Sequence, residues 1–195
     1  MSQQITTQID VRLGNRNRQS ALFRVILVLP AAIYASSFAN YQGRDWFLAG
    51  LLILPAGLAL LVRGVYPSYV LTLNKSLLAL NTRIAAYLFV LTDEYPSIES
   101  NEKIGVEFPE INGGQSLNRG LWLVKWLLAI PLYIVGSVYI IYALMLSIVA
   151  WITVVFTGTY PEWCIYGVIG TIAFWNRVYG YAVVLVTDEY PTFSL

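Results

Sequence analysis

Two apolar stretches near the start of the chain predict a pair of membrane-spanning helices. The first runs from about 21 to 38, the second from about 46 to 62, and a polar segment separates them. Each has about 17–18 residues, the lower end of what crosses a hydrocarbon core of about 30 Å. We therefore expect a helical hairpin over 21–62.

A second hairpin is predicted over 120–156, where Lys125 is the single charged residue. Gly136 and the two residues after it are the expected turn. Because the stretch is barely long enough for two crossings, a shallow re-entrant hairpin is the alternative.

Each predicted hairpin is followed by a helix of a different kind. Over 68–91, polar residues recur at three- and four-residue spacings among apolar ones, which is typical of a helix lying in the headgroup plane. The matching stretch 164–186 is more apolar, and either lies at the interface too or tilts into the bilayer. Alternating segments at about 8–13 and 103–108 predict strands. These pair with one another or with the extended ends of the two units.

The pentapeptide Thr-Asp-Glu-Tyr-Pro occurs at both 92–96 and 187–191. Upstream of each copy come a Tyr-Pro pair, an arginine sixteen residues after that proline, and a tyrosine four residues after the arginine. Arg24 also precedes a proline by six residues, as Lys125 does. These landmarks predict a duplication, with one repeat over 1–100 and the other over 101–195.

The predicted fold is mainly α and integral to a membrane. It consists of two parallel repeats, each a transmembrane helical hairpin plus an amphipathic interfacial helix, with short strands at the cytoplasmic surface. An even number of spans in each repeat implies a symmetry axis along the membrane normal. If both hairpins span, eleven of the twelve Lys and Arg residues fall on one side, and only Arg44 on the other. Positive residues favour the cytoplasmic side, which predicts that both termini are cytoplasmic.

The composition supports the membrane prediction and narrows the chemistry. Hydrophobic residues make up 57% of the chain and charged residues 12%, about half the usual charged share. The net charge of +1 gives no indication of a nucleic-acid partner. The chain has no histidine and one cysteine, Cys164. This excludes His-ligated metal, a histidine base and an internal disulfide.

The recurring polar residues near the two unit ends are the candidate site. They are Arg83, Tyr87, Asp93, Glu94, Arg177, Tyr181, Asp188 and Glu189. In each unit the arginine and tyrosine lie one helical turn apart, and the acids follow shortly after. We therefore expect each unit to pair its arginine with its own carboxylate at the membrane boundary. Such a pair either fixes the depth of the helix or belongs to a shared site on the repeat axis that binds a lipid headgroup or another small charged ligand.

Four segments resemble a bacterial membrane-protein family catalogued as domain of unknown function 4389, which often occurs as tandem copies. They are LWLVKWLLAIPLY at 121–133, FTGTYP at 156–161, Asn176-Arg177, and LVTDEYPTFSL at 185–195. The second unit matches along nearly its whole length, whereas the first keeps only the outline. The resemblance implies a repeated membrane protein of the bacterial cytoplasmic (inner) membrane. It implies no activity and no functional residues, because none is established for the family.

Motifs that carry chemistry are missing: the sequence has no Gly-rich phosphate loop, no Gly-x-Ser-x-Gly elbow and no zinc motif. The leading hypothesis is a non-enzymatic accessory or scaffold subunit of a larger bacterial membrane complex, with no cofactor. Its expected partners are membrane lipids and other integral membrane subunits or copies of itself. The alternative is a lipid or small-molecule binding or transport protein that uses a cleft between the two repeats.

Overall fold

Helices that run along the long axis of the molecule make up most of the computed structural model, which describes residues 4–39, 53–97, 99 and 103–195. Two helical stretches, Arg18–Ser37 and Ile130–Thr157, are long and apolar enough to cross a membrane. The described helices are α1 (Arg18–Leu27), α2 (Leu29–Ala39), α3 (Ile53–Arg63), α4 (Ser68–Leu88), α5 (Trp122–Leu128), α6 (Ile130–Thr157) and α7 (Glu162–Tyr179).

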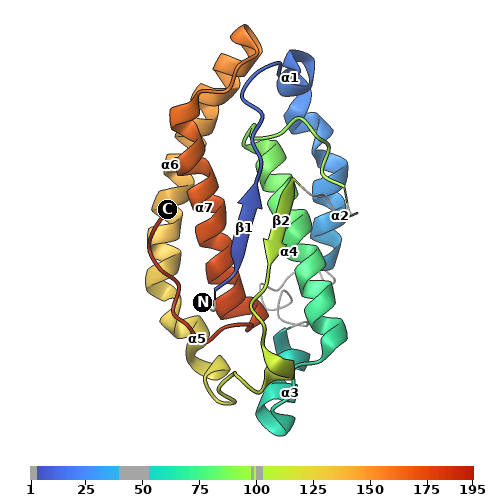
Figure 1. Cartoon of the computed structure of the whole chain (residues 1–195), viewed down its shortest axis with the longest axis vertical. Coiled ribbons are helices and arrows are strands. Elements are labelled where there is room, and N and C mark those ends of the chain that lie inside the picture. The colour runs from blue at the N-terminus through green and yellow to red at the C-terminus, as the bar shows by residue number, and fades with distance from the viewer. Residues whose placement is uncertain (1–3, 40–52, 98, 100–102) are drawn as a thin grey trace.

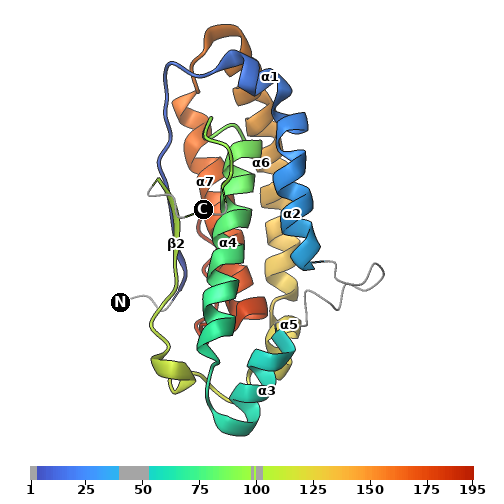
Figure 2. The same cartoon turned by 90° about the vertical axis from the view of Figure 1, so that its right-hand side faces the viewer.

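A two-stranded antiparallel ribbon covers one side of α4 and α7 (Figure 1). It joins β1 (Thr6–Ile9) to β2 (Ile104–Glu107). The two predicted strand segments therefore pair with one another. β2 packs on α4 and β1 packs on α7, while α6 packs along α7 on the side away from the ribbon (Figure 2).

The two halves of the chain run in opposite directions. In Figure 1, α1 starts at one end of the molecule and α5 at the other, and α4 and α7 are antiparallel. The connections cross between the halves: the Tyr66 backbone N–H donates to Gly113 O, and that of Tyr160 donates to Leu13 O (both 2.8 Å). Among the described elements, each half passes along the long axis in its strand, back in the helices that follow (α1 to α3, or α5 and α6), and forward again in α4 or α7. This odd number of passes reverses the second half relative to the first, which is opposite to the predicted parallel arrangement.

The predicted hairpin over 120–156 is wrong. α5 and α6 follow one another with only Ala129 between them, and the supposed turn lies inside α6. A Cβ atom on Gly136 would come within 2.7 Å of the Trp175 ring, so this glycine permits close packing of α6 on α7 rather than a turn. At 1.5 Å per residue, α6 is about 42 Å long and exceeds the hydrocarbon core.

The first predicted hairpin is described only in part. Its stretch 21–62 contains α1, α2 and α3, and its turn lies outside the described residues. The predicted orientation, with both termini in the cytoplasm, depended on a second hairpin and no longer follows.

Both long helical stretches are interrupted at matching places. α1 ends at Leu27 and α2 starts just before Pro30; α5 ends at Leu128 and α6 starts just before Pro131. A proline lacks the N–H that would bond the carbonyl four residues earlier, so the regular helix pattern breaks there.

The two predicted interfacial helices are packed inside the bundle. The polar stripe of α4 divides: Thr72 and Ser76 stay exposed, whereas Thr82 and Arg83 are buried against the ribbon and α7. The second predicted helix, 164–186, begins at Glu162 and ends in a short π-helix, η2 (Gly180–Val184).

Candidate functional site

A buried cluster at one end of the molecule holds the Asp93 carboxylate between two arginines. Arg16 Nε lies 2.9 Å from Asp93 Oδ2, and Arg24 Nη2 lies 3.0 Å from Oδ1. The backbone N–H of Asn17 donates to Oδ2 at 3.0 Å. The Asn17 side chain also caps α1 by accepting from Ser20 N–H. The start of α1 is therefore tied to the first pentapeptide, and we call these contacts the first cluster.

Arg24 reaches further into the same region. Its guanidinium lies 4.6 Å from the centroid of the Tyr87 ring, a cation–π contact, and it donates to the carbonyls of Tyr87 and Thr92. Arg24 is only 1% exposed. A buried charge of this kind needs both an opposite charge and hydrogen-bond acceptors, and the first cluster supplies both.

A second cluster with the same plan lies at the other end of the molecule. Lys125 Nζ lies 2.6 Å from Asp188 Oδ1, donates to Thr187 O at 2.6 Å, and lies 5.1 Å from the centroid of the Tyr181 ring. The Asn118 backbone N–H donates to Asp188 Oδ2 at 2.6 Å. Each aspartate thus contacts one buried cation and one backbone N–H at matching positions, and Arg16 is an additional partner of Asp93.

Local backbone geometry places both aspartates. The helix before each pentapeptide is terminated by a residue with positive φ, Val90 at 65° and Leu185 at 63°. The threonine that begins each pentapeptide then accepts a hydrogen bond from the backbone N–H two residues later, at Glu94 and Glu189. This turn directs the intervening aspartate toward the start of α1 or α5.

Burial and neighbouring charges shift the pKa of Asp93 in opposite directions. Burial raises the pKa of Asp93, but hydrogen bonds from Arg16 and Asn17 and the charges of Arg16 and Arg24 outweigh it and lower the pKa below its ordinary value. Asp93 is therefore ionised at neutral pH.

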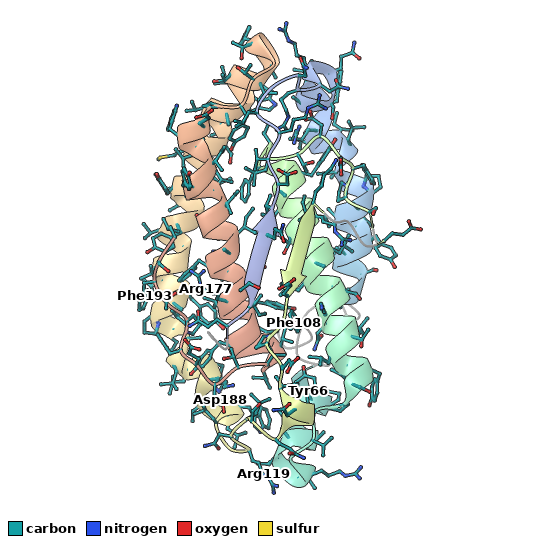
Figure 3. All side chains as sticks on the ribbon, viewed as in Figure 1. Tyr66, Phe108, Arg119, Arg177, Asp188 and Phe193 are labelled. Carbon is teal, nitrogen blue, oxygen red and sulfur yellow. The ribbon has the colours of Figure 1, made fainter. Side chains whose placement is uncertain are left out.

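The predicted pairing of Arg83 and Arg177 with the pentapeptide acids is wrong. Arg83 donates to the carbonyls of Ser97 and Glu99, and Arg177 to those of Thr192 and Ser194. Figure 3 shows Arg177 beside the C-terminal segment that carries Phe193, away from Asp188. The chain after each pentapeptide folds back over the arginine, so backbone carbonyls reach it before the carboxylates do.

The two pentapeptide glutamates lie nearer the surface. Glu94 forms an exposed ion pair with Lys103, and Glu189 accepts a hydrogen bond from the Gln4 side chain at 3.1 Å. Both contacts connect a pentapeptide to a segment beside the ribbon. The exposed ion pair of Glu94 contributes little to stability.

The candidate residues do not form one shared site on an axis. Tyr87 and Asp93 lie in the first cluster, which holds α1, and Tyr181 and Asp188 lie in the second, which holds α5. α1 and α5 are at opposite ends of the molecule (Figure 1). Between them, Thr82 Oγ1 accepts a hydrogen bond from Asn176 Nδ2 at 3.0 Å. These two residues directly precede the two arginines.

Sequence reasoning missed the cations that pair with the aspartates, namely Arg16, Arg24 and Lys125. The matched six-residue spacing of Arg24 and Lys125 to a proline was a usable signal, because it placed a cation at the same point of both units. No group of three or more Asp, Glu or Cys side chains within the described ranges is placed to hold a metal ion.

Comparison with known proteins adds no relative. Protein-family models, curated proteins and solved structures all gave no match to this chain.

Proposed function

We propose that the protein is a non-enzymatic accessory or scaffold subunit of a larger complex in the bacterial cytoplasmic membrane. The observation that supports this most is the exposure of its apolar helices. Only 22% and 28% of the residues in the two apolar windows are buried, whereas a core helix of a soluble protein is mostly buried. Soluble monomers rarely expose contiguous apolar surface of that extent.

The outward side chains suit contact with lipid or with partner helices. Both apolar stretches carry isoleucine, valine and methionine side chains that are more than half exposed. These include Val25, Ile26, Ile33, Ile134, Ile141, Met145 and Ile148. The buried charges Arg24 and Lys125 instead connect the last turns of α1 and α5 to the pentapeptides. A chain that turns its charges inward and its apolar residues outward is suited to assembly within a bilayer.

The proposal includes a duplication of inverted type. Matching contacts support it: a buried cation, a tyrosine and an aspartate meet in each cluster, and each half ends its second helix with a positive φ. With the long axis along the membrane normal, the two clusters lie on opposite sides of the bilayer, and the repeat axis lies in the membrane plane. Membership of the family of domain of unknown function 4389 is part of the same proposal.

Fractionation and gentle purification test this function. A tagged chain in its bacterial host is expected to stay in the membrane pellet after an alkaline carbonate wash. It is also expected to co-purify in mild detergent with other membrane proteins in fixed proportion. Release by carbonate contradicts the membrane location. Recovery as a free monomer from several mild detergents contradicts the subunit role.

A lipid-binding role is the second candidate, and apolar cavities between the halves favour it. One, of about 290 Å³, lies among α4, α6 and α7, with Thr82 and Asn176 in its lining. Volumes close to this are found in sites for small ligands.

A further inference from the structure

An apolar cavity of about 380 Å³ lies where α1 and the end of α4 meet α6. Its walls are apolar side chains from these elements, among them Val25, Leu88, Leu144 and Ile148. All four are exposed on the outside of the bundle. The cavity is therefore continuous with the surface that we propose contacts the bilayer.

Two buried polar atoms in the cavity lining make no hydrogen bond within the part of the chain that the structure describes. They are Arg24 Nε and Ser147 Oγ, in residues that are 1% and 7% exposed. The terminal nitrogens of Arg24 are already used by two carbonyls and by Asp93. What remains is one N–H and one O–H inside an apolar cavity, and buried donors of this kind normally have a partner.

The cavity walls select the kind of acceptor. Arg16 shares Asp93 with Arg24, but it does not line the cavity. An anion would have to lose its water among apolar walls, which is costly, whereas an uncharged oxygen avoids that cost. An uncharged oxygen attached to a long apolar body fits both the donors and the walls. An ester carbonyl at the head of an acyl chain has this chemistry.

Depth along the helix agrees with this choice. Arg24 lies six residues after the start of α1, about 9 Å along its axis. In the proposed membrane setting this is near the boundary between headgroups and hydrocarbon, where the ester groups of glycerolipids lie.

We propose that this cavity binds one acyl chain of a membrane glycerolipid, with the ester carbonyl oxygen accepting hydrogen bonds from Arg24 Nε and Ser147 Oγ. The inference rests on the proposed membrane location. It differs from a headgroup site at Arg83 or Arg177, because the recognised group is the ester rather than the phosphate.

Native mass spectrometry of the full chain in mild detergent tests the site, with ester-linked phosphatidylglycerol and its ether-linked analogue as probes. The ester lipid is expected to bind as one retained equivalent, and the ether lipid, which lacks the carbonyl, about tenfold more weakly. Equal retention of the two lipids overturns the proposal.

Variants locate the donors. Ser147→Ala is expected to lower ester-lipid retention to the ether level. Ser137→Ala, an exposed serine on the same helix, is expected to leave it unchanged. Arg24→Lys keeps a cation for Asp93, as Lys125 does for Asp188, but removes the Nε–H, and is expected to act like Ser147→Ala. Wild-type retention in both Ser147→Ala and Arg24→Lys overturns the assignment.

A variant that fills the cavity tests whether a loss of lipid retention comes only from a damaged fold. Ser147→Leu occupies the space with apolar atoms and is expected to abolish retention while preserving the thermal unfolding midpoint. Unchanged retention in a folded Ser147→Leu protein overturns the proposal. Carbonate extraction separates the two claims: release from the membrane defeats the proposed function, whereas a membrane-embedded protein without ester-lipid preference defeats only this site.

Discussion

The two clusters each hold a pentapeptide aspartate, but with different cations. The first holds Asp93 with Arg16 and Arg24, whereas the second holds Asp188 with Lys125 alone. Counting from the matched cations, Leu117 stands where the first half has Arg16. The same local framework therefore works with a forked guanidinium pair or with a single ammonium group.

The helix ends of the two halves differ by one residue. Arg16 donates to Val90 O and Leu91 O at the end of the first unit's helix. The second half has one more residue between its tyrosine and its pentapeptide and forms the short π-helix η2 there. Just after η2, Val186 N–H donates to Gly180 O, as Leu91 N–H donates to Ala86 O in the first half. A π-helix accommodates one extra residue, so both helix ends close with the same hydrogen bond although their lengths differ.

Removing the aspartates distinguishes the clusters most strongly. Asp93→Asn leaves two buried arginines that cannot lose their protons, and we expect a loss of about 3 kcal/mol in unfolding free energy. Asp188→Asn leaves one lysine, which unlike arginine can lose its proton when it is buried, so a smaller loss is expected. Denaturant unfolding in detergent measures both, and equal losses contradict the comparison.

Replacing Arg16 makes the first cluster resemble the second. Arg16→Leu leaves two helix-end carbonyls without their donor, and we expect a loss of about 2 kcal/mol. The exposed neighbour substitution Arg12→Leu is the matched control and should change little. A loss in Arg16→Leu no larger than in the control would show that Arg24 alone is sufficient.

The two Tyr-Pro tyrosines offer a comparison on a smaller scale. Tyr66 Oη donates to Val184 O at 2.6 Å and accepts from Asn74, and burial, partly opposed by that amide, raises its pKa to about 12. Tyr160 Oη is buried without a partner among the described residues, and Val168 occupies the position that corresponds to Asn74. Tyr66→Phe should therefore cost about 1 kcal/mol and Tyr160→Phe nothing, as thermal unfolding would show.

Acid sensitivity is the smallest difference that we expect. Because the folded-state pKa of Asp93 lies below its ordinary value of 3.8, its contribution is present above that value and is lost as the pH falls through the folded pKa. Unfolding midpoints measured from neutral to acid pH should fall less steeply in Asp93→Asn than in the wild type; equal slopes contradict this.

Local patterns predicted the parts of this fold that depend on local order. Apolar stretches located the helices, alternation located the two strands, and recurring residues placed Tyr87 and Asp93 at the helix end. The sequence alone could not predict the partners of Arg83 and Asp93, because these partners depend on where the chain returns after the pentapeptide. Gly136 is the same kind of case: glycine inside an apolar stretch marks a turn or a close helix contact, and only the position of Trp175 decides between them.

The inverted arrangement in a membrane requires α5 and α6 to cross the bilayer together as one span. In a Cys164→Ala background, single cysteines at the exposed positions Gln115 and Thr159 flank this span. A membrane-impermeant maleimide applied to intact spheroplasts is predicted to label one of them, and the other only after permeabilisation. Labelling of both cysteines, or protection of both, before permeabilisation would contradict a single crossing by α5 and α6 and favour the hairpin predicted over 120–156.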